Sequence, residues 1–82
     1  MSYQARILAD RVCPIYLLRE QPEDGVAKWF YLKLDDGNKT AFQHALKHGS
    51  FDCAAYGEVL ASGFGENPPS HITWELEAQG AI

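Results

Sequence analysis

The segment 26–34, with the sequence VAKWFYLKL, constrains this chain most, because it is a strand signal with large apolar side chains on both faces. Successive residues of a strand point to opposite faces of its sheet. One face therefore carries Val26, Phe30, Leu32 and Leu34, and the other carries Trp29 and Tyr31. A strand with one face in water alternates apolar and polar residues more regularly than this. The pattern predicts that a helix of the same chain, a second copy or a partner covers the second face.

The composition indicates one small folded domain over residues 1–82, with 46% hydrophobic and 22% charged residues. The formal net charge is -4, and the seven basic residues are scattered, so a nucleic-acid partner is not expected. No segment approaches the ~20 apolar residues of a membrane helix, and no secretory signal is recognisable. Two cysteines are too few for a disulfide framework. We therefore expect a cytoplasmic protein with no membrane contact and no cofactor.

A hairpin is predicted over residues 15–34. Residues 15–20 have strand character, and residues 21–25 place Pro22 and Gly25 around two acidic residues, which is typical of a turn. If Glu20 lies opposite Val26, Leu17 pairs with Trp29 and Tyr16 with Phe30.

The remaining elements follow from caps and periodicity. A helix is expected over 39–48, with Asn38 as its N-cap and Gly49 at its end, and Asp52 is placed to begin one further turn. Residues 58–65 read as a strand and 70–79 as a helix capped by Ser70. Residues 3–12 fit a strand or a short helix. The predicted fold is α+β, a small antiparallel sheet of three strands, with a fourth left open, and two short helices in the order β-β-α-β-α.

Two histidines have the spacing of metal ligands. His44 and His48 are four residues apart on the predicted helix, so their imidazoles project from neighbouring turns. Cys53 follows, and His71 is the only other histidine. A small metal-binding or thiol-dependent enzyme module using His44, His48 and Cys53 is the alternative function. The second half of a tetrahedral ligand set is not visible in the sequence.

Other patterns are explained by local structure. Gly63-Phe64-Gly65 lacks the third glycine and the later acidic residue of a dinucleotide-binding motif, which leaves strand geometry or a close backbone approach. The acidic pairs at 23–24 and 35–36 belong to predicted turns. Trp29, Tyr31 and Lys33 share a face and have the composition of a base-stacking platform, but no basic rim surrounds them.

The function predicted from the sequence is a non-catalytic binding domain that associates with itself or with another protein. Trp and Tyr are enriched at interface hot spots, and an uncovered aromatic face would be a large exposed apolar patch. The interface candidates are Trp29, Tyr31, Leu17 and Ile15. Self-association is expected through the hairpin or another exposed apolar edge. The acidity also permits a small regulator that binds a basic partner.

Overall fold

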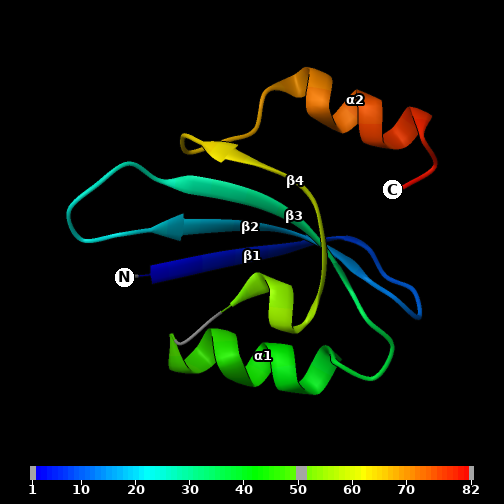
Figure 1. The fold of residues 1–82 in the computed structure, drawn as a ribbon, viewed down its shortest axis with the longest axis horizontal. Helices are drawn as coiled ribbons and strands as arrows, with labels where there is room; N and C mark the ends of the chain where they lie inside the picture. Colours follow the sequence, from blue (N-terminus) through cyan, green and yellow to red (C-terminus); the bar gives the residue numbers. More distant parts are fainter. Residues whose placement is uncertain (1, 50–51, 82) are drawn as a thin grey trace.

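The computed structural model describes residues 2–49 and 52–81, within which a four-stranded antiparallel sheet lies between two helices (Figure 1). The elements are β1 (Ser2–Ala9), β2 (Ile15–Gln21), β3 (Lys28–Leu34), α1 (Lys39–His48), the 3-10 turn η1 (Cys53–Ala55), β4 (Gly57–Phe64) and α2 (Ser70–Ala78). The strands are neighbours in the order β1-β2-β3-β4. The α+β class is confirmed. Neither helix of the described residues is long and apolar enough to cross a bilayer.

β1 is the fourth strand that the sequence left open. It pairs antiparallel with β2, from Ser2 opposite Gln21 to Ile7 opposite Tyr16. Residues 3–7 alternate in polarity, and the free edge of β2 supplies backbone partners that favour the extended state over a short helix. The element order is therefore β-β-β-α-β-α rather than β-β-α-β-α.

The hairpin of β2 and β3 forms as predicted, but its register differs by two residues. Glu20 lies opposite Lys28 rather than Val26, so Leu17 faces Tyr31 instead of Trp29. Val26 precedes the strand and is 67% exposed, contrary to its predicted place on an apolar face. The connecting loop is longer than the predicted turn. A shift of two residues keeps every side chain on its predicted face, because the side-chain period of a strand is two.

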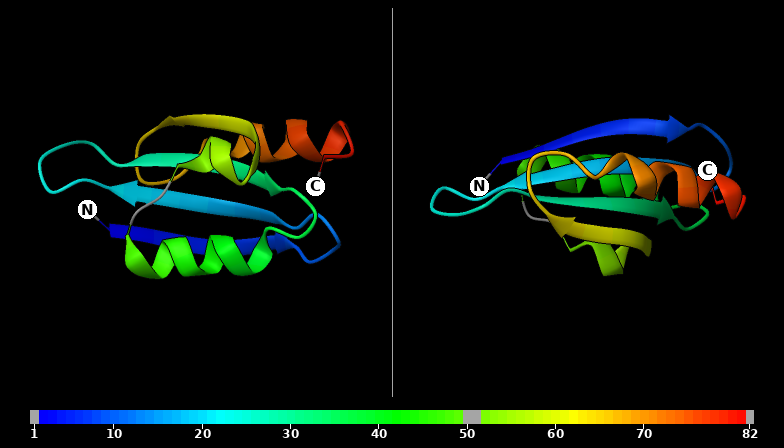
Figure 2. Two further views of the ribbon diagram at one scale, coloured as in Figure 1. Left: turned by 60° about the horizontal axis from the view of Figure 1, so that its bottom comes forward. Right: turned by 90° about the horizontal axis from the view of Figure 1, so that it is seen from above.

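Each face of the sheet carries its own apolar cluster under one helix. The right view of Figure 2 shows the sheet face on, with α2 in front of it and α1 behind. Under α1 lie Tyr16, Leu18, Phe30, Leu32 and Leu34, packed with Phe42. Under α2 lie Trp29 and Tyr31, packed with Leu76. The prediction that both faces must be covered is confirmed, and the chain covers them with its own helices.

The helix ends agree with the sequence except at the N-cap of α2. Asn38 occupies the N-cap of α1, but its side chain makes no cap hydrogen bond and instead donates from Nδ2 to the Tyr56 carbonyl at 3.0 Å. Gly49 ends α1 with a φ of 70°. Pro69, rather than Ser70, is the N-cap of α2, because its φ of -59° and ψ of 143° lead into the first turn.

β4 is shaped by a bulge and by one close approach. Tyr31 lies opposite Ala61 but Leu32 lies opposite Val59, so Leu60 is an extra residue on β4. At Gly63, an added Cβ would lie only 2.5 Å from Cζ2 of Trp29. The indole ring therefore packs directly on the backbone of β4. The sequence predicted a close approach at these glycines, and Gly63 confirms it.

Candidate functional site

Three of the four interface candidates lie in the core of the chain. Ile15 is 0%, Tyr31 1% and Trp29 5% exposed, and Leu17 is half-buried. Tyr31 is also held by α2, since its hydroxyl lies 2.8 Å from Oγ1 of Thr73. These aromatic side chains offer little surface to a partner or to a nucleic-acid base, because α2 occupies the face on which the stacking platform was considered. A surface for another molecule has to be sought elsewhere on the sheet.

His44 and His48 lie side by side on the exposed side of α1. Their ring centroids are 4.3 Å apart, and both residues are exposed. Together with Thr40, Ala41 and Tyr56 they line a broad, open depression. Within residues 2–49 and 52–81, no group of three or more His, Cys, Asp or Glu is placed to hold a metal ion. The helix thus brings two imidazoles together but no further ligand.

The thiols and the acidic pairs do not add to that pair. Cys13 is a free, half-buried thiol in the β1–β2 connection, and the side chain of Cys53 lies outside what the structure describes. The acidic pair 23–24 lies in the β2–β3 loop and the pair 35–36 follows β3, both exposed as predicted for turns. His71 lies on α2, across the sheet from His44 on α1. Of the residues considered for the alternative enzyme function, the described chain therefore brings His44 and His48 together and places His71 on the other side of the sheet.

One edge of the sheet is open along β1. In the right view of Figure 2, no described segment lies beyond β1 on the side away from β2. Edge strands present unpaired backbone N–H and C=O groups that readily pair with another strand. The opposite edge strand, β4, is interrupted by its bulge, which weakens it as a template. β1 pairs regularly with β2 from Ser2 to Ile7, so its open edge is uninterrupted over the same residues.

The side chains of β1 are almost symmetric about Ala5. Tyr3 and Ile7 lie at equal distances on either side of it, on the face of α1, and Ile7 is 42% exposed. Gln4 and Arg6 flank Ala5 on the face of α2, and both are exposed. The order apolar, polar, small, polar, apolar reads the same in both directions.

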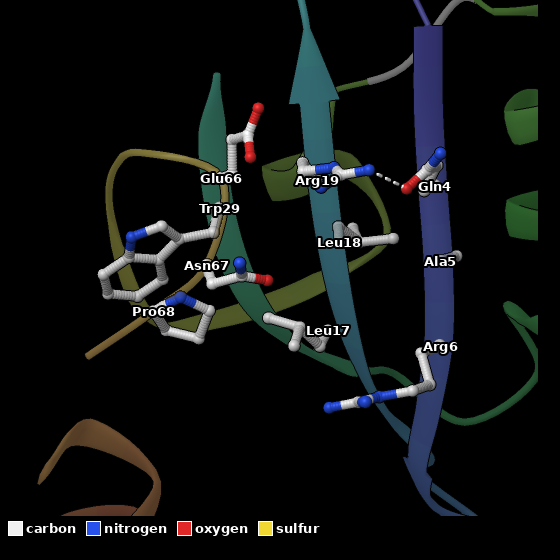
Figure 3. Close-up of a pocket in the computed structure, with 10 residues that line it drawn as sticks. All are labelled: Gln4, Ala5, Arg6, Leu17, Leu18, Arg19, Trp29, Glu66, Asn67 and Pro68. Atoms are coloured by element: carbon white, nitrogen blue, oxygen red, sulfur yellow. Dashed lines mark hydrogen bonds between the residues drawn. The ribbon is translucent and has the colours of Figure 1, made fainter. Parts of the chain in front are cut away.

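A cavity of about 240 Å³ lies on the face of α2, next to the part of the sheet that the helix covers (Figure 3). The sheet contributes Gln4, Arg6, Leu17, Arg19 and Trp29, and the β4–α2 loop contributes residues 66–68. Figure 3 shows the loop and the indole on one side and the β1 side chains on the other, with the hydrogen bond from Arg19 to Oε1 of Gln4 drawn as a dashed line.

Sequence reasoning missed this cavity because its residues come from four separate segments. The β1–β2 register places Arg6 opposite Leu17 and Gln4 opposite Arg19. Arg6 and Arg19 are therefore diagonal neighbours on one face, within reach of the same ligand. The alternation of polarity at residues 3–7 was the available signal, but it indicates a cavity only once the register of β1 with β2 is known.

The chain was compared with protein-family models, with curated proteins and with solved structures, and none of the three comparisons finds a match.

Proposed function

We propose that this chain is a non-catalytic binding domain that self-associates by pairing β1 with β1 of a second copy. The observation that carries the proposal is an uninterrupted edge strand whose side chains are symmetric about Ala5. Two identical strands that meet antiparallel around a two-fold axis place each residue opposite its mirror position. The two four-stranded sheets then become one continuous sheet.

The residues of β1 fit such a pairing centred on Ala5. Tyr3 of one copy lies opposite Ile7 of the other, which covers apolar surface that is open in the single chain. The two Ala5 side chains meet at the axis, where a small residue lets the strands approach without a clash. Backbone hydrogen bonds between the two strands supply most of the attraction.

The polar positions are also compatible with this pairing. Gln4 of one copy lies opposite Arg6 of the other, and the carboxamide oxygen accepts a hydrogen bond from the guanidinium. The oxygen of Gln4 already accepts from Arg19 of its own chain, and its second lone pair remains for Arg6 of the second copy.

The association is expected to be weak and reversible. An interface made by one strand edge is smaller than the roughly 1,200 Å² of a stable interface, so it falls in the class of weak, transient contacts. Because α2 covers Trp29 and Tyr31, the open edge of β1 is available for self-association and the hairpin face is not. We propose that this self-association takes place in the cytoplasm, a reducing compartment in which a free thiol such as that of Cys13 is expected.

Sedimentation equilibrium of Ala5→Glu and Ala5→Lys tests the proposal. Each substitution places like charges about 5 Å apart at the axis, so each variant alone is expected to stay monomeric. An equimolar mixture of the two variants is expected to dimerise, because opposite charges then face each other. Recovery in the mixture also shows that both variants are folded.

Ser62→Glu is the matched control, because Ser62 is exposed on β4 at the other edge of the sheet. This variant is expected to dimerise like the original chain. A chain that remains monomeric at about 1 mM, or a Ser62→Glu variant that loses dimers while Ala5→Glu keeps them, would contradict pairing through β1.

A further inference from the structure

The cavity beside α2 is built within one copy of the chain, although its residues Gln4 and Arg6 also face the second copy in the proposed dimer. Its volume of about 240 Å³ lies below the roughly 300–1,000 Å³ of pockets for drug-sized ligands, so it suits a small molecule. The floor is formed by β1, β2 and β3, and one wall is the loop that leads into α2. Regular strands therefore fix the backbone positions of the lining residues of the sheet.

Two guanidinium groups line this cavity. Arg6 makes no hydrogen bond or ion pair with any residue that the structure describes. Arg19 is half-buried, and Oε1 of Gln4 accepts a hydrogen bond from its Nη2, which leaves further N–H groups of the guanidinium for another acceptor. An arginine side chain binds a carboxylate through two parallel hydrogen bonds. Arg6 and Arg19 are therefore suited to bind the carboxylate of a ligand.

The other side of the cavity carries the Trp29 indole and the ring of Pro68, with the polar side chains of Asn67 and Glu66 beside them. The indole of Trp29 and the ring of Pro68 lie next to each other, and Leu17 lies to the right of Pro68 in the view of Figure 3. The indole Nε1 is buried and has no hydrogen-bond partner among the described residues. Trp29 is only 5% exposed, so an apolar group of a ligand contacts the small exposed part of the indole together with Pro68 and Leu17, and it does not compete for the guanidinium groups.

The charges of the cavity select the ligand class. Arg6 and Arg19 contribute two positive charges, and Glu66 at the β4–α2 loop contributes one negative charge. A single negative charge balances this set, whereas a dianion would leave an excess and meet the carboxylate of Glu66. We propose that the cavity binds a small monocarboxylate, with its carboxylate at the two arginines and a flat apolar body against Trp29, Pro68 and Leu17.

Titration with benzoate tests the proposal, and benzamide is the matched neutral probe of the same shape. The readout is the pair of indole N–H signals in a ¹H–¹⁵N spectrum. Trp29 lines the cavity and Trp74 is 71% exposed on α2, so Trp74 serves as an internal control. Benzoate is expected to shift the Trp29 signal with a dissociation constant of about 1 mM and to leave the Trp74 signal in place. Benzamide is expected to bind about tenfold more weakly.

Arg6→Gln and Arg19→Gln are each expected to weaken benzoate binding about tenfold. Arg11→Gln is the control, because Arg11 donates to the Ala81 carbonyl outside the cavity and its loss should leave benzoate affinity unchanged. Thermal melts confirm that each variant is folded. Equal affinity for benzamide, a Trp29 signal that does not move at about 20 mM benzoate, or equal binding of inorganic sulfate would overturn the proposal.

Discussion

Gly63→Ala is expected to destabilise the fold, although alanine is normally the better residue in a strand. An ideal Cβ at this position lies 2.5 Å from Cζ2 and 2.9 Å from Cε2 of Trp29. Carbon atoms prefer separations of about 3.5–4.0 Å, so the ring has to move by roughly 1 Å. Trp29 is only 5% exposed and packs against Tyr31 and Leu76, which limits that movement.

The magnitude follows from two opposing effects. Overpacking a buried site costs about 1–3 kcal/mol, and replacing glycine by alanine in a strand recovers about 0.5–1 kcal/mol. The free energy of unfolding is therefore expected to fall by about 0.5–2 kcal/mol, which lowers the Tm by about 2–16 °C in a domain of this size. Urea denaturation followed by tryptophan fluorescence measures the change.

Two further variants isolate the contact between Gly63 and Trp29. Ser62→Ala, at the exposed neighbouring position, should change the stability by no more than about 0.5 kcal/mol. In a Trp29→Leu background, Gly63→Ala should become neutral or stabilising, because the shorter side chain leaves room for the methyl group. An increase in stability for Gly63→Ala in the original chain would refute the close packing of the indole on β4.

Three other outcomes follow from the packing of the helices and from the exposed imidazoles. Leu76→Ala removes the buried anchor of α2 from the sheet and should cost about 2–4 kcal/mol in urea denaturation, whereas an unchanged stability would mean that α2 does not cover this face. Thr73→Val deprives the buried hydroxyl of Tyr31 of its hydrogen-bond partner and should lower the free energy of unfolding by about 1–3 kcal/mol. In a double-mutant cycle, the variant that also carries Tyr31→Phe should regain most of that stability. Stoichiometric Zn²⁺ should leave the Tm unchanged, because His44 and His48 supply only half of a tetrahedral ligand set, and a Tm increase that disappears in His44→Ala would instead establish a metal site.

The hairpin shows both the reach and the limit of sequence reasoning for this fold. Alternation along β3 was sufficient to assign Trp29 and Tyr31 to one face and Phe30 and Leu32 to the other. The register was wrong by two residues, because loop length depends on where strand pairing stops, and Val26 is apolar without being part of a strand. The face assignment survives this error because any even shift preserves it.

The candidate sites were predictable to a smaller extent. The helical spacing of His44 and His48 correctly placed their rings side by side, since it depends on one helix alone. The interface candidates were chosen for their aromatic character, which is equally suited to a core, and α2 turned them into core residues. The cavity with Arg6 and Arg19 depends on three strand pairings and one loop, none of which leaves a local signal.

The sequence by itself determined that the central strand of this protein is apolar on both sides, that helices begin near residues 39 and 70, and that glycine ends the first of them. These features depend on the periodicity and caps of single segments. Only the tertiary structure decided that α1 and α2 cover opposite faces, that β1 is left with an open edge, and that two arginines meet beside Trp29. Such features are set by the packing of segments far apart in the chain, because side chains compete for the same apolar surface and no local pattern records which of them will occupy it.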